Sequence, residues 1–142
     1  MKILIADDSS IIRESLGKLI SRNNPEAVIT NAVNVRDAIN KICEQNPDLI
    51  VLDLTMPGGD GFDVLREVQK RERKTTVILL TNYATDVNRK RGEQAKADFF
   101  FDKTDEFYKV IDVIKQKKES GRQQVFWYKK QGQIFRKNLN GI

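Results

Sequence analysis

The chain contains no histidine and a single cysteine, Cys43, among its 142 residues. The lack of histidine excludes imidazole catalysis and histidine-based metal sites, and one cysteine excludes an intrachain disulfide. Any bound metal would therefore be a hard ion held by oxygen ligands, such as Mg²⁺. The scarcity of cysteine fits a reducing, cytoplasmic environment. We take Cys43 to be a structural residue on a helix face.

Long apolar runs are also missing, since no stretch approaches the roughly 20 residues that span a bilayer. The N-terminal segment turns acidic at Asp7, too early for a secretory signal peptide. Hydrophobic residues make up 39% of the chain and charged residues 32%, which suits a folded domain with its own core. The net charge of +5 comes mostly from residues 119–142, which hold five basic side chains and one acid.

Apolar runs typical of buried strands alternate with stretches whose apolar residues recur at helical spacing. We expect strands at 2–6, 27–32, 48–53, 76–81 and 99–101, and helices at 10–21, 35–45, 61–72, 86–95 and 105–118, the last capped by Thr104. Each helix is then a crossover between parallel strands. The pattern predicts an α/β fold, a doubly wound five-stranded parallel sheet with helices on both faces.

Residues 1–118 account for this domain, whereas residues 119–142 do not continue the alternation. Two aromatic segments, 125–128 and 134–136, flank a polar stretch and predict a short hairpin. A lone hairpin is marginal in water, so we expect it to pack on the domain, a second chain or a partner, or to be mobile. Its aromatic and basic residues could also bind nucleic acid, but we favour a packing extension with solvated lysines.

Acidic side chains follow two of the predicted strands. Asp7 and Asp8 come directly after the first strand, and Asp53 follows the very apolar third strand. The carboxyl ends of parallel strands meet at one edge of the sheet, where ligands bind. Thr81 and Lys103 lie at the ends of the fourth and fifth strands. We therefore expect these five side chains to share one pocket.

Carboxylates gathered in one pocket repel each other unless a cation is present, and Mg²⁺ suits them. A carboxylate such as Asp53 is also a nucleophile able to form an aspartyl phosphate. A lysine can neutralise phosphoryl oxygens, and the Thr81 hydroxyl can donate to another of them. The set is therefore complete for phosphoryl transfer to Asp53. The alternative, in which Asp7 and Asp8 only cap a helix, leaves Asp53 and Lys103 without explanation.

Over residues 1–118 the sequence resembles a receiver domain of a two-component response regulator, of the stand-alone, chemotaxis-regulator-like type. That family has an acidic pair after strand 1, a phosphoacceptor aspartate within D-x-x-M-P-x-x-x-G after strand 3, a Thr or Ser after strand 4 and a Lys after strand 5. The matching residues are Asp7 and Asp8, Asp53 with Met56, Pro57 and Gly61, then Thr81 and Lys103. The resemblance implies a flavodoxin-like strand order, 2-1-3-4-5.

The resemblance also implies a role for each residue of the metal site. Asp8 and Asp53 would bind Mg²⁺ directly, together with the backbone carbonyl of Thr55. Asp7 would act through a metal-bound water. Asp53 would take its phosphoryl group from a sensor histidine kinase or a phosphotransfer protein.

The output of such a domain depends on two further positions. In the family, the residues that match Thr81 and Lys103 both contact the phosphoryl group. The residue that matches Thr81 moves toward the phosphoryl group. Phe100 holds the position of an aromatic that turns inward, which reshapes the face of the fourth helix, fifth strand and fifth helix. A downstream protein target would bind that face. Within the run Phe99–Phe101, Phe100 could equally be a core residue.

Four positions depart from the family pattern. Asn82 follows Thr81 where a small residue is usual, and Thr104 follows Lys103 where a proline, in a cis linkage, is usual. Lys96 occupies the place of a glycine before the fifth strand. Phe100 has no hydroxyl, so any switching by this ring can involve only packing.

The favoured reading is a receiver that signals by protein contact and is not an enzyme beyond its own phosphoryl transfer and dephosphorylation. One alternative is a receiver whose basic tail binds nucleic acid. The other is a Mg²⁺-dependent phosphatase with an aspartyl-phosphate intermediate. Such phosphatases place the nucleophile after the first strand in a D-x-D motif, which this chain lacks. No membrane partner is expected.

Overall fold

The computed structural model describes residues 1–72, 74–120, 125–130 and 133–138, and side chains as far as residue 119. Its strands are β1 (Lys2–Ala6), β2 (Val28–Ala32), β3 (Leu49–Leu52), β4 (Thr55–Met56), β5 (Gly59–Asp60), β6 (Thr76–Thr81), β7 (Phe99–Asp102), β8 (Val125–Lys130) and β9 (Gln133–Asn138). The helices are α1 (Ser10–Asn23), α2 (Val35–Gln45), α3 (Gly61–Gln69), α4 (Asp86–Gln94) and α5 (Lys109–Ser120).

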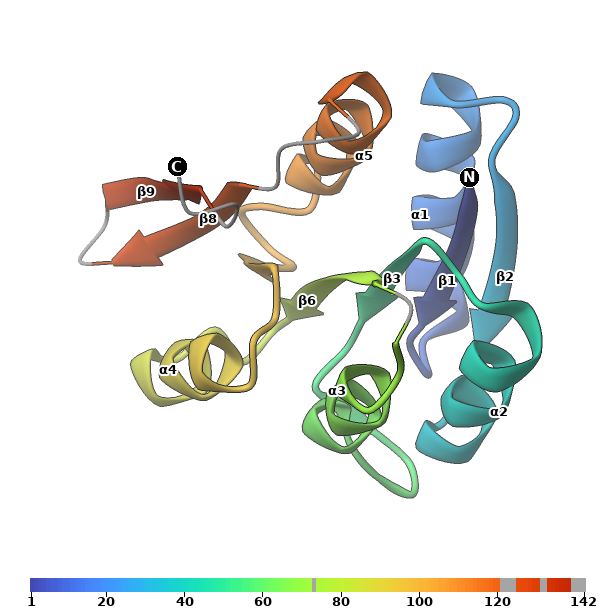
Figure 1. Ribbon diagram of the computed structural model, residues 1–142, viewed down its shortest axis with the longest axis horizontal. Coiled ribbons are helices and arrows are strands. Elements are labelled where there is room, and N and C mark those ends of the chain that lie inside the picture. Colours follow the sequence, from blue (N-terminus) through green and yellow to red (C-terminus); the bar gives the residue numbers. More distant parts are fainter. Residues whose placement is uncertain (73, 121–124, 131–132, 139–142) are drawn as a thin grey trace.

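Strands β2, β1, β3, β6 and β7 lie side by side in that order, and every neighbouring pair is parallel. This confirms the predicted doubly wound sheet. Helices α1 and α5 cover one face of it, while α2, α3 and α4 lie on the other (Figure 1). No helix of the described residues is long and apolar enough to cross a membrane.

The two faces of the sheet carry separate hydrophobic cores, because successive strand residues point to opposite sides. One core joins α1 and α5 to the sheet and includes Leu16, Ile20, Val51, Phe101 and Val110. The other joins α2 and α3 to it and includes Ala38, Ile42, Ile50, Leu65 and Phe100. All strands of the parallel sheet except the edge strand β2 are almost entirely buried, as their apolar composition predicts.

Two local expectations are wrong. Helix α5 begins at Lys109 rather than at residue 105, and Thr104 does not cap it. The Thr104 backbone N–H donates instead to the Asp102 carboxylate at 2.8 Å, and turns fill residues 103–108. Cys43 lies exposed on α2, beyond the buried stripe of that helix, so it is not a packed structural residue.

Two loop features were not predicted from the sequence in full: a short ribbon after Asp53 and a left-handed residue at Lys96. The segment after Asp53 forms a two-stranded ribbon, β4–β5, because Gly58 and Gly59 adopt φ values of 89° and 146°. Lys96, in the place of the family's glycine, has a left-handed φ of 63°. This conformation costs a non-glycine residue roughly 1 kcal/mol, so the departure noted in the sequence is a strained turn.

The predicted C-terminal hairpin is present as the antiparallel pair β8–β9. Strand β8 runs parallel to β7, with Phe99 opposite Trp127, and so extends the sheet to seven strands. The hairpin therefore packs on the edge of the domain, one of the outcomes expected from the sequence. Residues 131 and 132, between the two strands, fall outside the described part of the chain.

The buried carboxyl of Asp98 allows a test of how burial affects the stability of this fold. Its carboxylate accepts the Val77 N–H at 2.8 Å, and burial raises its pKa above the ordinary 3.8 despite nearby lysines. When folding raises the pKa of an acid, the folded protein becomes less stable as the pH rises through that pKa and the buried acid ionises. Asp98→Asn, which keeps an acceptor for Val77, should raise the free energy of unfolding at pH 7. Urea titrations should show no gain below pH 3.8, and a gain persisting there would contradict this account.

Candidate functional site

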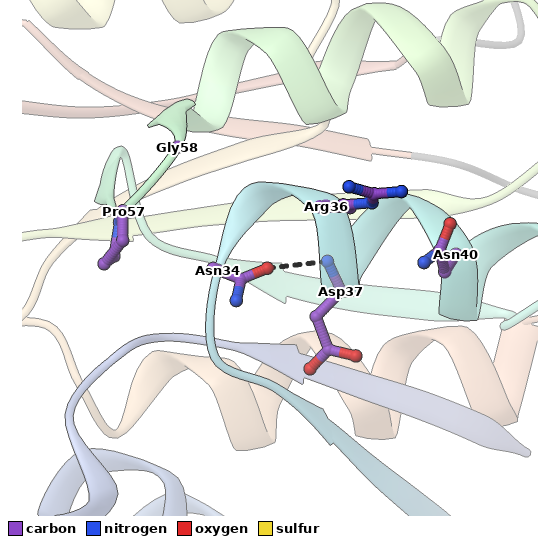
Figure 2. A pocket seen from close by; sticks show the side chains of 6 residues that line it. All are labelled: Asn34, Arg36, Asp37, Asn40, Pro57 and Gly58. Atoms are coloured by element: carbon purple, nitrogen blue, oxygen red, sulfur yellow. Dashed lines mark hydrogen bonds between the residues drawn. The ribbon is translucent and has the colours of Figure 1, made fainter.

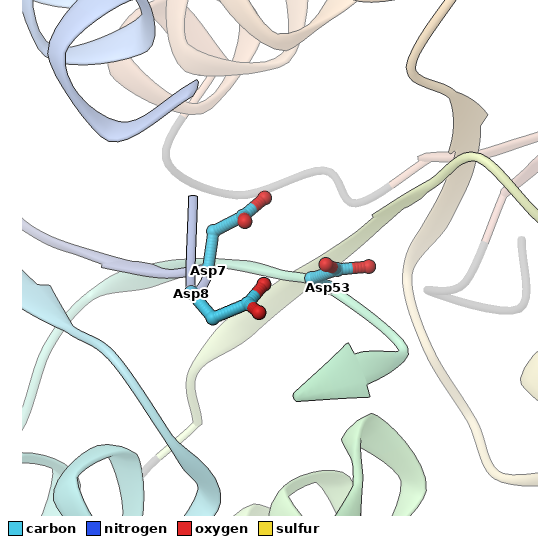
Figure 3. Close-up of side chains that lie close together, drawn as sticks. All are labelled: Asp7, Asp8 and Asp53. Carbon is cyan, nitrogen blue, oxygen red and sulfur yellow. The ribbon is translucent and has the colours of Figure 1, made fainter. Parts of the chain in front are cut away.

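The register of the sheet brings the acidic residues to one edge. Ala6 of β1 lies opposite Leu52 of β3, so Asp7 and Asp53 are the next residues on neighbouring strands. The Asp53 N–H donates to the Ala6 carbonyl at 2.9 Å, which continues the ladder past the strand end. In Figure 3 the side chains of Asp7 and Asp8 leave the end of one strand and that of Asp53 the end of its neighbour.

These three carboxylates form a compact acidic cluster. Oxygen atoms of Asp7, Asp8 and Asp53 all lie within 4.8 Å of one another. Asp7 is only 3% exposed and Asp53 6%, whereas Asp8 is exposed. Backbone N–H groups donate to both buried carboxylates, from Ser9 to Asp7 at 2.9 Å and from Thr55 to Asp53 at 3.3 Å. The arrangement can hold a divalent cation through oxygen ligands alone.

Lys103 bridges the two buried carboxylates from the end of β7. Its Nζ lies 2.6 Å from Asp7 Oδ2 and 3.0 Å from Asp53 Oδ2, and its side chain is 7% exposed. Burial raises the pKa of Asp53, and the charge of Lys103 only partly offsets this. Burial alone would lower the pKa of Lys103, but its hydrogen bond to Asp7 and the charge of Asp53 outweigh that and raise it. The lysine is thus the cation that compensates the cluster.

The remaining predicted residues lie near this cluster but do not join it. Thr81 is fully buried, and its hydroxyl accepts the Tyr83 N–H at 3.0 Å. Lys103 N–H donates to the Thr81 carbonyl at 2.9 Å, which places Thr81 beside the lysine. Phe100 is 2% exposed and packs in the core on the α4 side of the sheet, where the Arg89 guanidinium lies over its ring. The structure thus brings together Asp7, Asp8, Asp53 and Lys103.

A separate open hollow of about 490 Å³ lies between the start of α2 and the turn after β4. Its lining consists of Asn34, Arg36, Asp37 and Asn40 at the start of α2, with Pro57 and Gly58 on the neighbouring loop (Figure 2). Asn34 caps α2 by accepting the Asp37 N–H at 2.7 Å. None of the residues lining this hollow belongs to the acidic cluster, so the candidate site is the edge of the sheet and not this hollow.

The family described as response regulator receiver domain matches residues 3–115. The chain belongs to this family. The match covers the five parallel strands except for Lys2, and α5 as far as residue 115, and leaves out the β8–β9 hairpin. The acidic cluster and Lys103 therefore lie within the part of the chain that matches a receiver domain of two-component systems.

Curated relatives of this receiver are longer proteins. Over 98 residues, 68% of this chain, it is 44% identical to the transcriptional regulatory protein ResD of Bacillus subtilis (strain 168). It is 37% identical over 84 residues, 59% of this chain, to a protein-glutamate methylesterase/protein-glutamine glutaminase of Treponema denticola. The matched parts are 39% and 23% of those proteins, so the chain spans less than half the length of either.

Solved structures give the same fold. A signal receiver domain of a DNA-binding response regulator from Colwellia psychrerythraea 34H matches with a TM-score of 0.79 and 30% identity. The match covers 84% of this chain and 99% of that one. A CheY-like receiver domain from Methanospirillum hungatei JF-1 has a TM-score of 0.74 at 24% identity, over 82% of this chain and 91% of that one. At this identity the second likeness shows the fold alone.

Proposed function

We propose that this receiver accepts a phosphoryl group on Asp53 from a sensor histidine kinase or phosphotransfer protein, in the cytoplasm. The observation that carries the proposal is the position of the Asp53 carboxylate. It lies nearly buried, within 4.8 Å of two other carboxylates and 3.0 Å from a lysine ammonium. A buried carboxylate with a raised pKa and a specific charged partner is a typical mark of a reactive site.

In the proposed reaction an Asp53 carboxylate oxygen attacks the phosphorus of a phosphohistidine. A phosphorus–oxygen bond forms and the phosphorus–nitrogen bond breaks, and its electron pair returns to the imidazole nitrogen, which takes up a proton. Lys103 is placed to leave Asp53 and neutralise a phosphoryl oxygen instead. Thr81, whose hydroxyl now accepts the Tyr83 N–H, would turn that hydroxyl to donate to another phosphoryl oxygen.

The donor set fits Mg²⁺, because it consists of carboxylate and backbone carbonyl oxygens. Asp8 and Asp53, with the Thr55 carbonyl, would hold the ion, and Asp7 would act through a water. The exposure of Asp8 supports a direct role for its carboxylate, whereas Asp7 and Asp53 both accept hydrogen bonds from Lys103 and from a backbone N–H. When bound, the ion would supply positive charge to the carboxylates and to the incoming phosphoryl oxygens.

For output, a downstream protein would bind the face formed by α4, β7 and α5, with residues 1–118 as the receiver and 119–142 as an extension. Phe100 packs beneath α4, so a change in the position of its ring would change the surface that α4 presents to a partner. ResD is named a transcriptional regulator and another relative an enzyme, and neither activity is proposed for this chain. A protein contact, rather than nucleic acid, is the output proposed here.

The decisive experiment uses phosphoramidate and Mg²⁺ as the phosphoryl donor system and reads intact mass. Wild-type protein should gain the mass of one phosphoryl group, and Asp53→Asn should gain none, because an amide is not a nucleophile at phosphorus. Asp105→Asn, which changes an exposed acid two residues after Lys103, is the matched control and should behave as wild type. An absent adduct on wild type, or an equal adduct on Asp53→Asn, would refute the proposal. Repeated turnover of a phosphomonoester would instead favour a phosphatase.

A further inference from the structure

The loop that carries Lys103 is closed on itself by hydrogen bonds between Asp102 and Glu106. The Glu106 backbone N–H donates to the Asp102 carbonyl at 2.8 Å, and its Oε1 accepts the Asp102 N–H at 3.2 Å. Thr104 N–H donates to the Asp102 carboxylate at 2.8 Å, a bond that a proline at this position would lack. Lys103 thus sits within a short ring of hydrogen bonds between residues 102 and 106.

Glu106 is itself one of the few charged residues buried in this fold, with 4% of its surface exposed. Two cations from different helices compensate its charge. Lys109 Nζ of α5 lies 2.7 Å from Oε2, and Arg89 of α4 lies 3.7 Å from Oε1. A carboxylate buried this deeply is stable only when it is paired and hydrogen-bonded, as it is here. The position of the lysine loop is therefore tied to two helices through one side chain.

The contact between Glu106 and α4 is made by Arg89, which also packs on Phe100. Its guanidinium lies over the Phe100 ring, 5.2 Å from the centroid, and among the described buried side-chain polar atoms its Nη1 alone has no hydrogen-bond partner. Helix α4 has little apolar contact of its own, since Gly92 is its only buried residue. In the position where Arg89 contacts Glu106 and Phe100, its Nη1 is buried without a hydrogen-bond partner, which is an unfavourable arrangement. Glu106 is thus one of the residues that contact α4, through its ion pair with Arg89.

We propose that Glu106 is the positioning residue for Lys103, and that it holds the ammonium within reach of Asp53 while coupling it to α4 and α5. The inference rests on the proposed phosphoryl acceptance at Asp53. The peptide bond between Lys103 and Thr104 is trans, as are all described peptide bonds. The order of this loop therefore comes from Glu106 and Asp102 rather than from a proline. In an ordinary helix-start role, Glu106 would affect stability but not the reactivity of Asp53.

The test measures the rate of adduct formation with phosphoramidate at saturating Mg²⁺ in wild type, Glu106→Ala and Glu106→Gln. Removing the whole carboxylate should slow the reaction about tenfold, because small misplacements of a reacting group carry large rate penalties. Glu106→Gln keeps an acceptor for the Asp102 N–H but loses both ion pairs. Its rate should therefore lie between those of wild type and Glu106→Ala. Asp105→Asn removes a neighbouring exposed charge and should leave the rate unchanged.

A double-mutant cycle separates positioning from general destabilisation. If Glu106 acts through the lysine, Glu106→Gln should have no further effect on the rate in a Lys103→Met background. An equal slowing in both backgrounds, or no slowing in the wild-type background, would overturn the inference. Should Glu106→Ala fail to fold by circular dichroism, the isosteric Glu106→Gln carries the cycle alone. A wild-type protein that takes up no phosphoryl group would refute the proposed function, and this inference with it.

Discussion

Lys103→Met should destabilise the protein by about 3 kcal/mol at neutral pH, as expected when one partner of a buried ion pair is removed. The ammonium is the only cation with a described contact to the Asp7 and Asp53 carboxylates, and those two acids are 3% and 6% exposed. Methionine preserves most of the side-chain volume, so the loss would reflect charge rather than a cavity. Urea unfolding monitored by circular dichroism measures the change.

The direction of the pH dependence follows from the pKa of Asp53. Burial already raises this pKa, and loss of Lys103 removes the contacts that lower it. A carboxyl whose pKa is raised by folding contributes stability at low pH and loses it as the pH rises through the raised value. The defect of Lys103→Met should therefore be large at neutral pH and shrink in acid, where the carboxyls are protonated.

Millimolar Mg²⁺ should restore part of this stability, because an ion that binds only the folded state stabilises it. The lysine variant should gain more from Mg²⁺ than wild type does, since no ammonium competes for the carboxylates. Lys70→Met is the control, because Lys70 makes an exposed pair with Glu67 and its loss should change stability by less than roughly 1 kcal/mol. An equal loss in both variants, or no response to Mg²⁺, would show that Lys103 does not compensate the cluster.

The sequence predicted the parts of the fold that depend on hydrophobic periodicity. The alternation of apolar strands with amphipathic helices has one simple solution, a parallel sheet covered on both faces, and the structure has this sheet. The order of its strands, β2-β1-β3-β6-β7, was implied by the family resemblance and not by the periodicity. The reasoning from periodicity also placed Asp7, Asp53 and Lys103 together, because parallel strands end at one edge. Periodicity and topology were sufficient for these residues.

Contacts between side chains and backbone were beyond the reach of periodicity. Thr104 looked like a helix cap because a small hydroxyl residue preceded an amphipathic stretch. The Glu106 N–H, which such a cap could accept, donates instead to the Asp102 carbonyl, and the Asp102 carboxylate accepts the Thr104 N–H. Glu106 itself gave no signal, since an acid near the start of a helix is usually solvated. Its burial depends on Arg89 and Lys109, which reach it from two different helices.

Gly61 illustrates a residue that the motif located and only the structure explains. Its N–H donates to the Leu54 carbonyl at 2.8 Å as α3 begins, so the helix passes directly over the end of β3. A Cβ at this position would lie 2.5 Å from the Asp53 carbonyl oxygen and 3.0 Å from Leu54 Cα. These are backbone atoms and cannot rotate aside. The glycine is therefore required by the close approach of two backbones beside Asp53.

Gly61→Ala should consequently destabilise the protein by about 3 kcal/mol, the upper part of the usual range for overpacking. It should also slow phosphoryl uptake, because any relief of the clash displaces the Asp53 backbone relative to Lys103. Gly17→Ala is the matched control, since nothing lies within 4 Å of its added Cβ inside α1, and it should stabilise by roughly 1 kcal/mol through helix propensity. Urea titrations and the phosphoramidate assay on both variants measure the two effects. If Gly61→Ala kept wild-type stability and rate, α3 would be free to move away from β3, and the fixed position of Asp53 would need another cause.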